Sequence, residues 1–136
     1  VSAAWLWDAR LLVLHAVQFP LEGHLRYTGT PEQEIEEYRE KTRKEAEQVL
    51  HEHLATTDYR TLTQGTQVAV SPGPPDVVIE EAIPEHAADL LLMGTVARGG
   101  IPGLLVGNTA ERLLPVVNCS LIAVKPDDFV CPIRLD

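Results

Sequence analysis

The chain alternates between short apolar runs and longer stretches whose apolar residues recur at helical spacing. The apolar runs cover residues 11–17, 66–70, 90–93 and 120–124. Short apolar runs bounded by turn-forming residues are typical of buried β-strands. The first run is apolar almost throughout, which predicts a strand buried on both faces of a sheet. We therefore expect four strands.

The longest helical pattern covers residues 30–55. Thr30 is predicted to cap this helix, because its hydroxyl can accept a hydrogen bond from a first-turn amide while Gln33 completes a capping box. Residues 18–29 are predicted to form a loop, since proline and glycine interrupt any regular pattern there.

Two shorter helices are predicted over residues 76–86 and 109–117, the second with Asn108 as its N-cap. Strands that alternate with helices indicate parallel pairing, because each helix returns the chain to the same end of the sheet. The expected fold is α/β, with an open, doubly wound parallel sheet of the Rossmann-like type. Ligands of such sheets bind beyond the carboxyl ends of the strands, where Val17 and Gly94 lie.

The stretch that follows the third apolar run contains the features that indicate a ligand-binding site. The run ends at Gly94, a glycine-rich loop follows, and Gly107 precedes the next helical pattern. Unpaired amides and the positive end of the helix dipole make such a helix start attractive to an anion. This arrangement predicts a phosphate-bearing ligand. The loop is not a P-loop, because no Gly-Lys-Ser/Thr closes it, and it contains no GxGxxG dinucleotide motif.

The same stretch resembles the universal stress protein signature, Gly-x2-Gly-x9-Gly-Ser/Thr. Gly94 and Gly107 have the required spacing, while Ala97 stands at the second glycine and Asn108 at the hydroxyl position. Two segments are most similar in sequence to the E-type branch of the family, namely MGTVARGGIPGLLVGNTAE and the tail SLIAVKPDDFVCPIRLD. The resemblance covers nearly the whole chain.

The resemblance implies a stress-associated, nucleotide-type ligand-binding or regulatory module in the cytoplasm, with weak or no catalysis. E-type members carry two such domains in tandem, and this chain looks like the second. The resemblance also implies pairing through the last strand, either with another copy or with the tandem domain. It places a further strand, central in the sheet and carrying an adenine-contacting Asp, ahead of the first residue here, so the first strand is missing from this chain.

The candidate site combines strand ends with the loop and the helix start. Arg98 is the only basic residue of the loop, and it can either pair with a phosphate or remain a solvated surface residue. The expected ligand is ATP or AMP, bound weakly, or another phosphorylated small molecule. No catalytic or metal-binding set is expected. The candidate ligand-binding residues are Ala16, Val17, Met93, Gly94, Thr95, Ala97, Arg98, Gly107, Asn108 and Thr109.

Two alternatives to a ligand-binding module stay open. The first is a slow ATP-hydrolysing enzyme that uses the same loop. The second is a purely structural dimerisation domain whose loop is only a crossover connection. Binding of a nucleotide would exclude the second alternative, and turnover of the bound nucleotide would favour the first.

Composition and charge limit the expected domain organisation, partners and compartment of the chain. The chain has 136 residues, enough for one domain, which we place at residues 1–126 with a tail over residues 127–136. Eleven basic and twenty acidic residues give a net charge of −9, which argues against nucleic acid or an anionic membrane as partner. Two cysteines make no disulfide framework and fit the reducing cytoplasm. No apolar run is long enough to span a membrane.

Overall fold

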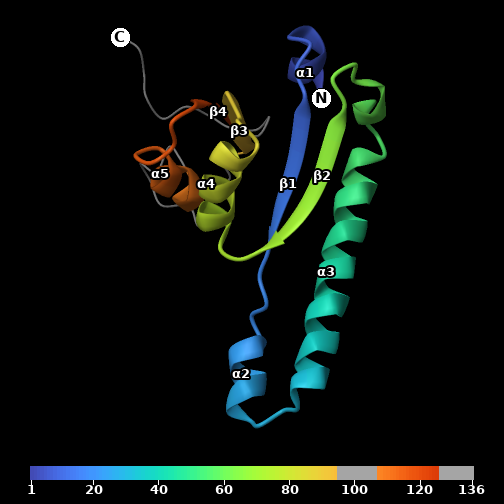
Figure 1. Cartoon of the computed structure of the whole chain (residues 1–136), viewed down its shortest axis with the longest axis vertical. Coiled ribbons are helices and arrows are strands. Elements are labelled where there is room, and N and C mark those ends of the chain that lie inside the picture. Colours follow the sequence, from blue (N-terminus) through green and yellow to red (C-terminus); the bar gives the residue numbers. More distant parts are fainter. Residues whose placement is uncertain (95–106, 126–136) are drawn as a thin grey trace. The chain divides into compact units, whose positions relative to one another are not determined.

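The computed structural model describes residues 1–94 and 107–125, and it divides the chain into two compact units, residues 1–75 and 76–136 (Figure 1). The elements of the first unit are α1 (Ser2–Leu6), β1 (Leu11–Val17), α2 (Glu22–Tyr27), α3 (Glu32–Leu54), the 3-10 turn η1 (Tyr59–Thr61) and β2 (Thr66–Pro72). Helix α4 (Pro75–Glu85) begins at the boundary. The second unit continues with β3 (Leu90–Gly94), α5 (Asn108–Leu113) and β4 (Ser120–Val124).

The first unit is built on a parallel strand pair. Strand β1 pairs with β2 in a register that sets Leu11 against Thr66 and Val17 against Pro72. Helix α3 runs alongside the pair, and its amino-terminal half extends past the carboxyl ends of both strands, where α2 lies beside it (Figure 1). The buried apolar residues of this unit are Ala4, Val17, Ile35, Leu54, Tyr59 and Leu62.

The second unit repeats the parallel arrangement on a smaller scale. Strand β3 pairs with β4, with Leu90 opposite Ser120 and Gly94 opposite Val124. An ion pair of 3.2 Å between Asp76 Oδ2 and Arg112 Nη1 joins the start of α4 to the end of α5. The buried apolar residues in the described part of this unit are Val78, Ala82, Ala110 and Leu113, all of them on the two helices.

The strand predictions are confirmed in place and direction. All four runs form strands, and the first and last have the predicted bounds. Both pairs are parallel, as in an α/β protein. Within the described residues β1 pairs with β2 and β3 pairs with β4, which agrees with the expected α/β fold class. An apolar run specifies a strand but carries no signal for which neighbour it will bond to.

Burial of the first strand also differs from the prediction. Only Val17 of β1 is buried, whereas Leu11, Leu12 and the following residues are half-buried and His15 is exposed. A two-stranded sheet with one long helix beside it leaves much of its apolar surface uncovered. A continuous apolar run therefore indicates the strand itself but not how many layers cover it.

Residues 18–29 contain a helix that the sequence pattern concealed. Helix α2 forms over six residues although Gly23 lies within it. It ends at Thr28 and Gly29, and Gly29 has φ = 73°, a left-handed conformation that glycine adopts at no steric cost. The amide of Thr30 donates to the carbonyl of Leu25 at 3.0 Å, which closes the helix end. Gly29, one of the residues that favoured a loop here, instead marks the carboxyl end of α2.

Both predicted side-chain caps are wrong by one residue. Helix α3 has Pro31 as its N-cap and no capping side chain, because the hydroxyl of Thr30 pairs with that of Thr28 at 3.2 Å. Helix α5 has Gly107 as its N-cap, so Asn108 is the first helical residue. Helix α5 also ends at Leu113 rather than near residue 117, since Pro115 has no amide to continue the hydrogen-bond ladder.

Candidate functional site

The strand that leads into the signature loop ends at Gly94. Met93 is half-buried and Gly94 is exposed at the carboxyl end of β3, opposite Val124 of β4. No atom of the described residues lies within 4 Å of the position that a Cβ on Gly94 would occupy. The described residues therefore do not crowd the backbone at this strand end.

The helix start on the other side of the loop is free of side-chain caps. Gly107 precedes α5 with φ = −70° and ψ = 157°, and its carbonyl accepts a hydrogen bond from the Glu111 amide at 3.0 Å. Asn108 is exposed and Thr109 is half-buried. The first amides of a helix have no intrahelical acceptor, so this turn offers donors to an anion. The predicted residues Thr95, Ala97 and Arg98 lie outside the described residues.

The remaining predicted residues lie in the first unit. Ala16 and Val17 stand at the carboxyl end of β1, where Ala16 is opposite Ser71 of β2. The Gly73 amide donates to the Val17 carbonyl at 2.9 Å, and Gly73 has φ = 134°. Ser71 and Gly73 therefore belong to the same strand edge, although the predicted strand ended at residue 70. The signal that identifies them is the parallel register, which places equivalent strand ends side by side.

The structure brings the predicted residues together in two groups. Ala16 and Val17 form one group with the end of β2, whereas Met93 and Gly94 share the second unit with residues 107–109. A site that joins both groups stays a prediction.

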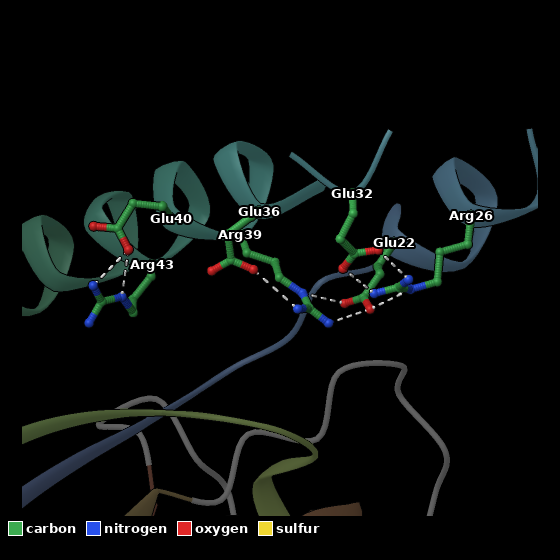
Figure 2. A network of polar contacts seen from close by, with 7 residues as sticks. All are labelled: Glu22, Arg26, Glu32, Glu36, Arg39, Glu40 and Arg43. Carbon is green, nitrogen blue, oxygen red and sulfur yellow. Dashed lines mark hydrogen bonds and ion pairs between the residues drawn. The ribbon is translucent and has the colours of Figure 1, made fainter. Parts of the chain in front are cut away.

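A network of ion pairs on α2 and α3 was not predicted (Figure 2). Glu22 lies between two guanidinium groups, with Arg26 Nε at 3.0 Å and Arg39 Nε at 2.9 Å from its carboxylate oxygens. The pKa of Glu22 is lowered by its hydrogen bonds with Arg39 and Arg26, and the pKa of Glu32 is lowered by its hydrogen bond with Arg26. The acidic run at the start of α3 is thus partly engaged rather than only solvated.

Metal and membrane chemistry find no support in the part of the chain that the structure describes. No group of three His, Cys, Asp or Glu side chains there could hold a metal ion. His51 and His53 instead bond through Nδ1 to the carbonyls of Glu47 and Val49 on their own helix, at 2.7 and 2.8 Å. Every helix within residues 1–94 and 107–125 is too short or too polar to cross a bilayer.

The backbone at Gly107 corrects one sequence-based expectation and leads to a prediction. A glycine before this helix is expected either to let the backbone approach a ligand or to have positive φ, and the second reason is excluded because Gly107 has an extended conformation that any residue adopts. We expect Gly107→Ser to raise the free energy of unfolding by about 0.5–1 kcal/mol, because serine caps the helix better and restricts the unfolded chain. Chemical denaturation measures the change, and Asn118→Ser at another exposed position is the control. A loss of stability in Gly107→Ser would show that the glycine is required by the fold.

Parallel strands joined by helices, with a glycine at a strand end and another at the following helix start, define an α/β protein of the Rossmann-like class. Residues 1–125 match the model of the universal stress protein family. The chain therefore belongs to the universal stress protein family.

Known relatives agree with this assignment. Universal stress protein E of Escherichia coli K12 is 37% identical over 67 residues, which are 49% of this chain and 21% of that protein. The match thus spans about a fifth of the length of that relative. Universal stress protein UspA from Lactobacillus plantarum has the same fold, with a TM-score of 0.59, 20% identity, and coverage of 90% of this chain and 82% of that chain. A universal stress protein in complex with cAMP has a TM-score of 0.50 and 18% identity, over 90% of this chain and 78% of that one.

Proposed function

We propose that this chain is a regulatory module of a stress response that binds a nucleotide or another phosphorylated small molecule in the cytoplasm, with weak or no catalysis. The observation that carries the proposal is the pair of glycines at the two sides of the signature loop. Gly94 ends a parallel strand where no atom of the described residues would contact an added Cβ, and Gly107 precedes a helix whose first turn has no capping side chain. A universal stress protein that is bound to cAMP supports a ligand of the same chemical class.

The proposed ligand contacts follow from the residue types at the loop. Thr95, Arg98 and Thr109 supply hydroxyls and one positive charge, while Gly94 and Gly107 let the backbone approach a phosphate. Ala16, Val17 and Met93 supply the apolar strand ends. These assignments extend the family resemblance to individual positions of this chain.

Two departures from the family signature weaken the proposed binding of ATP or AMP. Ala97 adds a methyl group where the signature has glycine, and Asn108 replaces a hydroxyl. The Asn108 side chain is exposed and makes no capping hydrogen bond to α5. The single charge of Arg98 is expected to contribute less than about 1 kcal/mol and not to offset both losses.

The test is a calorimetric titration of the chain with ATP, AMP and cAMP. We expect weak binding, and we expect Ala97→Gly combined with Asn108→Ser to tighten ATP binding roughly twofold to tenfold, since one recovered hydrogen bond contributes about 0.5–1.5 kcal/mol. Asn118→Ser, the same exchange at an exposed residue away from the loop, should leave the affinity unchanged. Tight ATP binding by the unmodified chain, or no effect of the double substitution, would contradict the assignment. Phosphate release at a steady rate would indicate a hydrolase.

We also propose that β4 pairs with another copy or with a tandem domain. Within the described residues β4 pairs with β3, and the apolar side chain of Ile122 is 38% exposed. Exposed apolar residues on a strand favour pairing with another chain. We expect Ile122→Lys to weaken self-association roughly tenfold in sedimentation experiments, since a central interface residue typically contributes more than about 1 kcal/mol. Leu92→Lys, opposite Ile122 on β3, is the matched control. A parent chain that stays monomeric at high concentration refutes self-pairing.

A further inference from the structure

Helix α2 has almost no apolar attachment to the rest of its unit. It is six residues long and none of its residues is buried. Tyr27, at its last position, is 90% exposed. A helix of this length is unstable by itself, so contacts with neighbouring elements must hold it. The contacts that the structure provides are mainly polar.

Two guanidinium groups link α2 to α3 (Figure 2). Arg26 on α2 forms a two-pronged pair with Glu32 on α3, at 2.7 Å and 2.9 Å. Arg39 on α3 binds both oxygens of Glu22 on α2 and also reaches Glu36 at 3.3 Å. Two-pronged pairs joined in a network are the arrangement in which surface charges contribute most.

The segment between β1 and α2 is attached at the same place. The rings of Phe19 and Tyr38 meet edge to face at 6.3 Å, and the guanidinium carbon of Arg39 lies 5.9 Å from the centre of the Phe19 ring. The Leu21 amide donates to the Tyr38 hydroxyl at 3.3 Å. Arg39 therefore holds both α2, through Glu22, and the chain that leaves Val17, through Phe19.

We propose that residues 18–30 form a strap that ion pairs latch onto α3, and that loss of charge on Glu22 and Glu32, or screening by salt, releases it. The strap begins directly after Val17, at the carboxyl end of β1, and lies beyond that strand end beside α3 (Figure 1). Its release loosens the chain that leaves the carboxyl end of β1, the edge at which Rossmann-like proteins bind ligands. The charge state of this surface thereby controls how firmly that chain segment is held next to the edge.

The direction of the pH dependence follows from the charges around the two carboxylates. Glu22 faces Arg26 on its own helix and Arg39 on α3, and Glu32 faces Arg26, with Glu36 as the further acid on Arg39. These arginines lower the pKa of Glu22 and Glu32 below the ordinary 4.5. The latch is thus fully formed above pH 4.5 and is lost as the pH falls through the lowered values.

Hydrogen exchange measured by mass spectrometry tests the latch at neutral pH. The amides of Leu25 and Thr28 report on α2, because they donate to the carbonyls of Leu21 and His24 within the strap. In Glu22→Gln combined with Glu32→Gln, we expect the protection of residues 22–30 to fall about twofold to fivefold. Strand β1 and the second half of α3 should keep their protection. High salt should have the same effect on the parent and little on the double variant.

Glu40→Gln is the matched control. Glu40 is also paired, with Arg43 at 2.7 Å and Lys44 at 3.3 Å, but all three residues belong to α3, so this change cannot unlatch α2. Unchanged protection of α2 in the double variant would overturn the proposal. An equal loss of protection in β1, or an equal effect of Glu40→Gln, would also overturn it, because the ion pairs would then act on the whole unit.

Discussion

Replacing Leu113 with alanine is expected to lower the free energy of unfolding by about 2–5 kcal/mol, the usual cost of emptying a leucine site in a core. The Leu113 side chain is fully buried, and it lies one turn after the buried Ala110 on the same face of α5. Among the described residues of the second unit, the other buried apolar side chains are Val78 and Ala82 of α4. The cavity therefore opens in the centre of a small core.

Leu114→Ala is a stringent control for this change. It deletes the same atoms at the next residue, where the side chain is 51% exposed, and should shift stability by less than about 0.5 kcal/mol. Denaturant titrations followed by circular dichroism compare the two variants. Equal effects of both substitutions would show that Leu113 is not enclosed as the structure has it.

The second large effect is expected for Ile35→Ala in the first unit, again about 2–5 kcal/mol. Ile35 is 1% exposed in the first turn of α3, which has only one other buried residue, Leu54 at its far end. Most of the solvent-shielded contact at the amino-terminal end of the helix therefore depends on Ile35. Loss of this contact should also loosen the part of α3 to which the strap is latched.

Val49→Ala controls for the removal of apolar atoms from the same helix. Val49 is 49% exposed, so its truncation should change the free energy of unfolding by less than about 0.5 kcal/mol. Ile35→Val removes only one methylene and should lower the free energy of unfolding by a smaller amount, about 0.5–1.5 kcal/mol. If Ile35→Ala melts like the parent, the packing assigned to the start of α3 is wrong.

Hydrophobic patterning was sufficient to locate the strands and the long helix. The runs at Leu11–Val17 and Ser120–Val124 became strands with the predicted bounds, and the helix that begins near residue 30 ends at Leu54 as expected. The helix predicted over residues 76–86 forms as α4 (Pro75–Glu85), with Val78 and Ala82 buried. Burial of one face produces a periodic signal over many residues, which a sequence shows directly.

Features decided by single hydrogen bonds could not be predicted in the same way. Thr30 and Asn108 are good capping residues by type, but the helices begin one residue away from the positions they would cap. Helix α2 depends on Glu22, Arg26 and their partners on α3, which lie close in space but have no repeating pattern in the sequence. Strand pairing likewise depends on contacts between distant segments.

In the candidate site, too, some features could be predicted from the sequence and others could not. The positions of Gly94 and Gly107 at a strand end and a helix start were predicted from spacing and are confirmed. The conformation of Gly107 and the contribution of Gly73 to the end of β1 required coordinates. Whether the two strand ends bind one ligand stays a prediction that the nucleotide titration tests.

The parallel registers also set the order in which the chain can assemble. Pairing Leu11 with Thr66 closes roughly twice as much chain as pairing Leu90 with Ser120. Each doubling of a flexible loop costs only about 0.6 kcal/mol of closure entropy, so length alone slows the first pair little. The longest element of that longer loop is α3, whose charges at i and i+4, such as Arg43 with Glu47 and Lys44 with Glu40, favour the helix before any strand forms. We expect α3 to fold early as a rigid spacer that delivers β2 to β1, so that substitutions in its solvent-facing ion pairs slow folding more than they speed unfolding.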